Sequence, residues 1–222
     1  MKSRFLSYPL SSNIPVYGIW PQKPHISPVR SLIAGDSCNV YNINIENHWG
    51  THVDCPAHFF NDGKKVVDYE ADFWLFEHPQ VITVKAKEGQ LIDEKDMFGD
   101  INEDTDLLII YSGWGKQRNT VEYAQRNPGL RPEFGFFLRN GYNNIRAVGF
   151  DWISVSSYMY REIGRDAHRA FLNPAPKGSP VVIIEDMLLY DDMTGLKEVF
   201  VMPLRIEEVD SAPCTVLGVW ND

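Results

Sequence analysis

The chain has 222 residues, of which 44% are hydrophobic and 23% charged, and this balance is typical of one globular domain covering residues 1–222. Its formal net charge of −9 disfavours nucleic acid and anionic membrane surfaces as partners, because binding to either depends on basic residues. No segment reaches the roughly 18 uninterrupted apolar residues of a membrane span, and residues 1–25 lack the pattern of a secretory signal. Three widely spaced cysteines favour a reducing compartment, so we expect a cytoplasmic protein.

Residues 1–35 are rich in proline, serine and aromatic side chains, and their weak periodicity predicts an irregular arm with one or two short strands. Within this arm, Tyr17 and Trp20 could either cover the core or form a lid over a pocket. The next segment, residues 42–46, alternates polar and apolar side chains as a strand does.

Residues 48–58 concentrate chemistry-bearing side chains, with half of the six histidines of the chain and an aspartate in one short stretch. These residues are His48, His52, Asp54 and His58. Histidine and aspartate supply the neutral nitrogens and anionic oxygens that bind Zn²⁺, Mn²⁺ or Fe²⁺. The stretch therefore predicts the core of a hydrolytic metal site.

The glycine and proline inside this stretch argue against a helix. We expect His48 at the end of a strand, followed by a sharp bend at residues 50–51. His52 and Asp54 then lie two residues apart on an extended segment, where both side chains point to the same side. The hydroxyl of Thr51 could orient one of the metal-binding side chains.

The rest of the chain alternates predicted strands and helices. In order, we expect strands at 81–85 and 107–111, a short helix or turn at 93–98, a helix at 132–141, a strand at 147–151, a helix at 165–172, and strands at 181–185, 198–202 and 214–220. The continuously apolar strand at 107–111 indicates burial on both faces. A helix that leads into a strand through a short connection is typical of an α/β fold.

Four residues along the chain have two interpretations on pattern alone. Trp114 follows a strand and could be structural or contact a substrate. Cys55 is interpreted as a buried structural thiol rather than a nucleophile. His168 could be an ordinary helix histidine or a ligand, and Glu185 could be a strand-ending solvent contact or a buried ligand whose charge a metal compensates.

Residues 48–58 match the pattern H-x-G-T-H-x-D-x-P-x-H at all seven fixed positions. In this the chain resembles the metal-dependent cyclase/hydrolase family that includes bacterial kynurenine formamidases and isatin hydrolases. The resemblance continues along nearly the whole chain, at residues 13–17, 111–114, 149–154, 183–187, 203–204 and 212–214. The family carries a further aspartate near Ser156, and this chain does not.

The resemblance implies a single α/β domain with a swivelling β/β/α-type core, a mixed sheet and flanking helices, in a homodimer or larger homo-oligomer. It implies that the N-terminal arm contributes to subunit contacts and to the substrate pocket, with Trp20 as a candidate for packing against substrate. It implies one or two divalent metal ions per chain. As the metal we favour zinc, with manganese second. The implied ligands are His48, His52, Asp54, His168 and Glu185.

The resembling family also implies a reaction. One metal would lie on His48, His52 and Asp54, and a second, on His168 and Glu185, would share Asp54 as a bridge. Activated water would attack the carbonyl carbon of an amide, formamide or cyclic amide. His58 would take the proton of the water and deliver it to the leaving nitrogen.

Two other functions are compatible with these residues. One is a lactone hydrolase or a cyclase on the same metal site, and the other is a non-catalytic protein that binds a metal or a small ligand. Turnover of a panel of formamides, cyclic amides and lactones would separate these functions.

Overall fold

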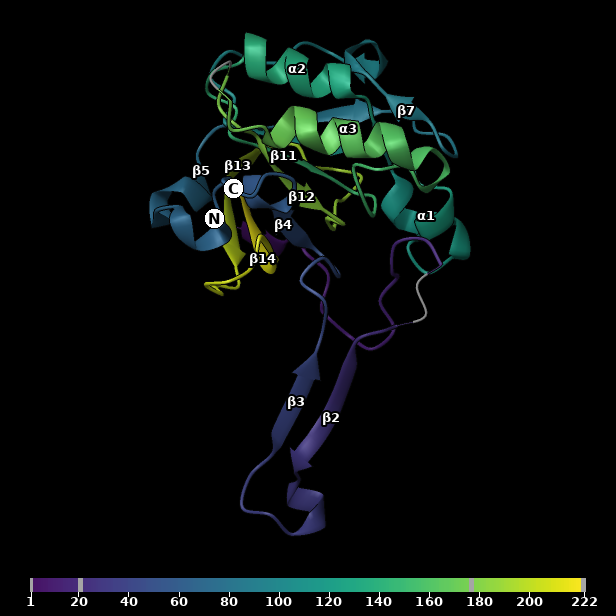
Figure 1. Cartoon of the computed structure of the whole chain (residues 1–222), viewed down its shortest axis with the longest axis vertical. Coiled ribbons are helices and arrows are strands. Elements are labelled where there is room, and N and C mark those ends of the chain that lie inside the picture. The colour runs from purple at the N-terminus through teal and green to yellow at the C-terminus, as the bar shows by residue number, and fades with distance from the viewer. Residues whose placement is uncertain (1, 20–21, 176–177, 221–222) are drawn as a thin grey trace.

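The computed structural model describes residues 2–19, 22–175 and 178–220, and their central feature is a curled mixed β-sheet (Figure 1). Its strand order is β5-β13-β14-β4-β12-β11-β9-β6-β8, and β1 pairs with β14. The strands are β1 (Lys2–Phe5), β4 (His52–Asp54), β5 (Leu75–Phe76), β6 (Pro79–Val84), β8 (Met97–Phe98), β9 (Leu107–Tyr111), β11 (Ala147–Phe150), β12 (Val182–Glu185), β13 (Leu196–Pro203) and β14 (Ser211–Trp220). Two small sheets pair β2 (His25–Arg30) with β3 (Val40–Asn44) and β7 (Leu91–Ile92) with β10 (Gly129–Leu130).

Three α-helices lie in the described residues: α1 (Val121–Gln125), α2 (Pro132–Gly141) and α3 (Arg161–Leu172). Short 3₁₀ helices span Leu32–Ala34, Pro56–His58, Val66–Asp68, Ala71–Trp74, Glu94–Asp96, Trp114–Gln117 and Tyr158–Tyr160. α2 and α3 run side by side over one face of the sheet (Figure 1). The predicted α/β class, with a mixed sheet and flanking helices, is confirmed.

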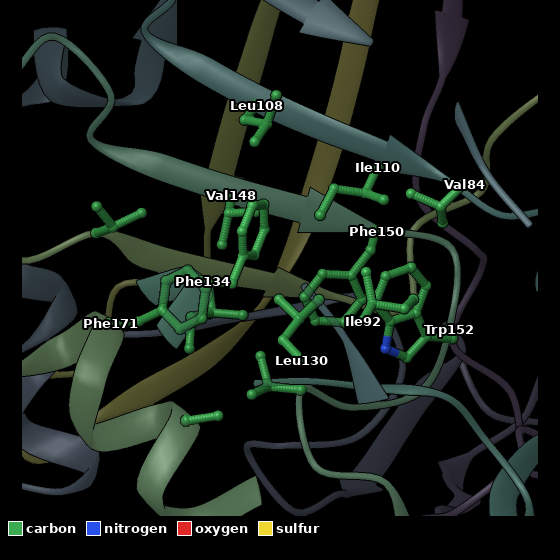
Figure 2. Close-up of a cluster of buried hydrophobic side chains, with 14 of the residues drawn as sticks. Val84, Ile92, Leu108, Ile110, Leu130, Phe134, Val148, Phe150, Trp152 and Phe171 are labelled. Atoms are coloured by element: carbon green, nitrogen blue, oxygen red, sulfur yellow. The ribbon is translucent and has the colours of Figure 1, made fainter. Parts of the chain in front are cut away.

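The centre of the sheet is parallel, because β12, β11, β9 and β6 pair in parallel, while the strands on both sides of this block pair antiparallel. Every residue of β11 and β12 is buried, as expected for parallel strands covered on both faces. On one face, side chains of the central strands pack against α2 and α3 (Figure 2). The strands contribute Leu108, Ile110, Val148 and Phe150, and the helices contribute Phe134 and Phe171. Leu107 and Ile109 point to the opposite face and join a second cluster.

The indole of Trp114 is buried and donates a hydrogen bond to the carbonyl of Tyr123 at 3.4 Å. It packs within the cluster on the helix side of the sheet. Of the two interpretations of Trp114, the structure therefore supports the structural one.

A β-hairpin joins a strand inside the predicted arm, β2, to a strand that follows the arm, β3. β2 and β3 pair antiparallel, are connected through the 3₁₀ helix Leu32–Ala34, and project far from the body of the molecule (Figure 1). All of their residues except the half-buried Ser27 are exposed. The alternation at residues 42–46 indicates a strand, and β3 overlaps this segment. The pairing of β2 with β3 was not predicted, because it joins two separate segments of the chain. No helix in the described ranges combines the length and the apolar character that crossing a membrane requires.

Candidate metal centre

The register between two antiparallel strands brings the first ligand candidates together. β4 lies between β12 and β14, and His52 stands directly opposite Glu185. Ile183, two residues before Glu185, packs in the cluster on the helix side of the sheet, so Glu185 points to the same side. The predicted bend is present, because Gly50 adopts a left-handed φ of 71° two residues before the start of β4.

The imidazole of His52 is buried, and one of its nitrogens lacks a partner. Nδ1–H donates to the carbonyl of Gly50 at 2.8 Å, which leaves Nε2 without a proton in the neutral ring. Nε2 is buried without a hydrogen bond and faces Asp54 Oδ1 and Glu185 Oε2, each at 3.5 Å. A nitrogen lone pair aimed at two carboxylates is a costly arrangement unless a cation lies between them.

His168 approaches the same carboxylates from α3. Its Nδ1–H donates to the carbonyl of Gly164, one turn earlier in the helix, at 2.8 Å. Its Nε2 then faces Asp54 Oδ2 at 3.6 Å and Glu185 Oε1 at 3.5 Å. His168 and Glu185, which the resemblance implies as ligands of one ion, lie next to one another in the fold.

Hydrogen bonds hold both carboxylates in place. Ser211, opposite Asp54 in the β14–β4 pair, donates its hydroxyl to Asp54 Oδ1 at 2.9 Å. Glu185 Oε1 accepts from the backbone N–H of Val155 at 2.6 Å and from the hydroxyl of Ser154 at 3.2 Å. Partners of this kind orient ligands in metal sites.

The ligand-orienting role predicted for Thr51 is wrong. Its hydroxyl donates to the carbonyl of Asp186 at 2.6 Å and accepts from the backbone N–H of Tyr8 at 3.0 Å. The side chain of Thr51 thus connects two chain segments instead of contacting a ligand candidate. Ser211 takes the predicted role.

His48 and His58 form the more accessible half of the site, with side chains 30% and 27% exposed. Asp210 joins them, because its Oδ2 lies 2.7 Å from His58 Nδ1 and 3.1 Å from His48 Nε2. The second nitrogen of His48, Nδ1, lies 2.9 Å from Asp54 Oδ1. The centroids of the two imidazole rings lie 4.2 Å apart, with the ring planes tilted by 38°.

The charges of the site shift the pKa values of its members. Burial lowers the pKa of His48, but Asp54 and Asp210 outweigh burial and raise it to about 10. Burial likewise opposes a raised pKa at His168, which Asp54 and Glu185 bring to about 9. Burial raises the pKa of Asp210 and of Asp54, but neighbouring histidines dominate and hold both below their usual range.

The donor set fits a divalent cation, because imidazole nitrogens and carboxylate oxygens converge around an unpaired buried nitrogen. Among the residues that the structure describes, two groups of at least three have ligand atoms within 4.8 Å of one another. One is His48, Asp54 and His58, and the other is His52, Asp54 and Glu185. Asp54 belongs to both, as expected for a bridging carboxylate. The predicted division is different, since it assigned His48 and His52 to one ion. Bonding across β4 and β12 instead places His52 with Glu185.

The long segment between α3 and β12 is accommodated through Arg139 of α2. Its guanidinium donates to backbone carbonyls on both sides of the segment, including those of Ala170, Asn173 and Gly178, at 2.7 to 2.9 Å. The last turn of α3 therefore stays anchored while the loop extends.

Trp20, the candidate for substrate packing, lies outside the described residues.

Asp210 and Ser211 are functional-site residues that the sequence analysis missed. A polar pair just before an apolar strand was the available signal, and such a pair is common at strand ends. What distinguishes this pair is the pairing of β14 with β4, which local sequence does not encode.

Cys55 is fully buried, and burial raises the pKa of its thiol, so the interpretation as a structural cysteine agrees with the fold.

Comparisons with known proteins identify the family of this chain. Residues 5–157 match the model of the family described as "Putative cyclase". A kynurenine formamidase from Bacillus cereus is 29% identical over 211 residues, covering 94% of this chain and 92% of that protein. A kynurenine formamidase from Sphingopyxis alaskensis is 26% identical over 211 residues, covering 94% and 93%.

Solved structures share the fold. Isatin hydrolase A from Labrenzia aggregata superposes with a TM-score of 0.76 at 19% identity, over 98% of this chain and 93% of that chain. A predicted metal-dependent hydrolase from Bacillus stearothermophilus has a TM-score of 0.74 at 20% identity, over 98% and 97%. These similarities confirm the architecture along almost the whole chain.

Proposed function

Because this chain belongs to the cyclase family, we propose that it is a metal-dependent hydrolase of a non-peptide carbon–nitrogen bond. The formamidase relatives and the isatin hydrolase fold support an aryl formamide or a cyclic aryl amide as the substrate class. The observation that carries the proposal is the buried, unpaired Nε2 of His52 between Asp54 and Glu185.

The residues that would hold metal are His48, His52, Asp54, His168 and Glu185. Their mixed nitrogen and oxygen atoms suit zinc, with manganese as the second candidate and one or two ions per chain. A divalent ion at such a site polarises a carbonyl oxygen and makes water a nucleophile near neutral pH.

His58 is the proposed general base and acid. A carboxylate only accepts hydrogen bonds, so Asp210 binds His58 through Nδ1–H and leaves Nε2 to take and return a proton. Asp210 holds the ring in this orientation and stabilises the imidazolium formed after proton uptake. His58 then delivers the proton to the nitrogen that leaves as the amine.

Metal content and turnover together test this function. Protein purified without an affinity tag should contain metal, and His52→Ala and Glu185→Ala should each reduce the metal content. The same preparations should hydrolyse formylkynurenine, formanilides or isatin, with loss of turnover matching loss of metal. A parent chain that hydrolyses lactones but no amide would contradict the proposed bond type. A parent that binds no metal after reloading would contradict the mechanism.

We further propose that the protein is a homodimer. The support is the β2–β3 hairpin, which exposes Val29, Tyr41 and Ile43 at 54%, 55% and 64%. A two-stranded hairpin is at best marginally stable alone in water, so an extended one with apolar side chains on its surface favours a protein partner.

A further inference from the structure

A cavity opens beside the metal centre on the side of His48. It has a volume of about 400 Å³, within the usual range for small-molecule sites. His48 contributes to its lining, so a molecule in the cavity lies next to the proposed reaction centre. Among the other lining residues are Tyr17, Tyr158, Glu46 and Arg161.

The walls of this cavity are aromatic and held in place. Tyr17 and Tyr158 meet edge to face at a centroid distance of 5.5 Å. The ring of Tyr158 packs so closely on Gly18 that a Cβ there would lie 2.3 Å from it. The backbone N–H of Tyr158 also donates to the side-chain oxygen of Asn127, which is fully buried. Such walls suit a flat aromatic body.

Arg161 brings a positive charge to this cavity, and its situation differs from that of the other arginines of α3. Arg165 and Arg169 each pair with an acidic residue three positions earlier, Glu162 and Asp166. Arg161 makes no ion pair with any residue that the structure describes, and its guanidinium lies 5.7 Å from the centre of the Tyr158 ring. Burial is the largest effect on Tyr17 and raises the pKa of its hydroxyl, whereas the charge of Arg161 lowers this pKa. The charge of Arg161 therefore acts on the inner wall of the cavity.

A guanidinium without an acidic partner at the edge of an aromatic cavity matches a carboxylate, which it binds through two parallel hydrogen bonds. Glu46 also lines the cavity, so an anion is favourable only in the part that Arg161 reaches. The chain as a whole is acidic, with 30 acidic and 21 basic residues, and its net negative charge repels anions. The positive charge of Arg161 therefore makes its end of the cavity the part that attracts an anion.

We propose that Arg161 binds a carboxylate of the substrate, and that the favoured substrates are aromatic amides with an anionic group remote from the scissile bond. This inference rests on the proposed hydrolase function, which supplies the reaction at the other end of the cavity. Arg161 contacts the substrate without taking part in proton transfer, so it determines specificity.

A matched pair of substrates tests the proposal: 4-(formylamino)benzoate and its neutral analogue 4-(formylamino)benzamide. The parent should prefer the benzoate in kcat/KM. Arg161→Gln should lower kcat/KM for the benzoate by about ten- to a hundredfold, mainly through KM, as expected for a charged hydrogen-bonded pair. The benzamide should stay within about twofold. Arg161→Lys should recover part of the preference, and Arg165→Gln on the same helix should retain all of it.

Equal losses for both substrates in Arg161→Gln would make Arg161 structural, and no preference in the parent would overturn the proposal. Calorimetric binding of the products, 4-aminobenzoate and 4-aminobenzamide, separates this inference from the hydrolase function. If 4-aminobenzoate binds in a manner that depends on Arg161 but neither formamide is hydrolysed, the anion site is supported and the hydrolase function is contradicted. Turnover of both formamides that is indifferent to Arg161 would contradict the anion site alone.

Discussion

At the scale of single residues, His58 differs from His52 and His168 in its partners. His52 and His168 each donate Nδ1–H to a backbone carbonyl and aim Nε2 at both Asp54 and Glu185, whereas His58 is bound to the side chain of Asp210. We therefore expect His58→Ala to keep its metal and to lose about 10²–10⁴-fold in kcat, the usual contribution of a general acid–base group. Metal analysis and steady-state kinetics on one preparation check this.

The exposed His78, which pairs with Asp104 away from the site, provides the control. His78→Ala should match the parent in metal content and kcat. If His58→Ala lost as much metal as His52→Ala, His58 would instead be a ligand, as its proximity to His48 and Asp54 permits.

Proton release gives a second prediction at this scale. With pKa values of about 10 and about 9, His48 and His168 are both protonated at pH 7 in the metal-free protein. Metal binding requires neutral imidazole, so loading at pH 7 should release up to about two protons. Calorimetry in two buffers of different ionisation enthalpy measures this number. Release of no protons would mean that these histidines are neutral before the metal binds.

The same raised pKa values predict how the stability of the metal-free protein depends on pH. The folded pKa lies above the ordinary value of 6.5, so the stabilisation is complete below about pH 6.5 and is lost as pH rises through about 9 to 10. The free energy of unfolding of metal-free protein, measured by urea titration, should therefore decrease between these values. A chain loaded with metal should not show this decrease, because its histidines are already neutral.

At the scale of elements, the close approach of α3 to the loop after β11 positions His168. A Cβ on Gly164 would lie 2.2 to 2.5 Å from the hydroxyl, Cβ and Cα of Ser156. Gly164→Ala should push α3 outward, cost about 1–3 kcal/mol of stability and weaken metal binding. Gly141 at the end of α2 has open space around it, so Gly141→Ala should be neutral or slightly stabilising. Urea unfolding and metal titration on both variants check this contrast.

Elements with strong local signals could be predicted from sequence. Residues 132–141 form α2 with the predicted bounds, since proline begins the helix and glycine ends it, and residues 107–111 form β9 with the predicted bounds. The bend and the extended pair at His52 and Asp54 were also local. The contribution of Asp210 and the grouping of His52 with Glu185 were not, because both depend on strands far apart in sequence.

At the scale of the whole molecule, the hairpin is the feature that the isolated chain does not explain. Its tip includes Ile33, which is fully exposed, and its strands present apolar side chains to solvent far from the core (Figure 1). Burying such side chains between two copies removes them from water at a gain of about 1.5–3 kcal/mol for each large one. A symmetric dimer would make this gain twice, because each copy contributes the same surface.

We therefore expect the parent to sediment with about twice the chain mass of 25.5 kDa at micromolar concentration. Ile43→Glu would place a charge in the buried surface and should shift sedimentation toward the monomer. Phe136→Glu is the matched control, because Phe136 is 50% exposed on α2, in the body of the molecule. A parent that is monomeric at all concentrations would contradict the homodimer. Equal dissociation of both variants would place the interface on the body instead of the hairpin.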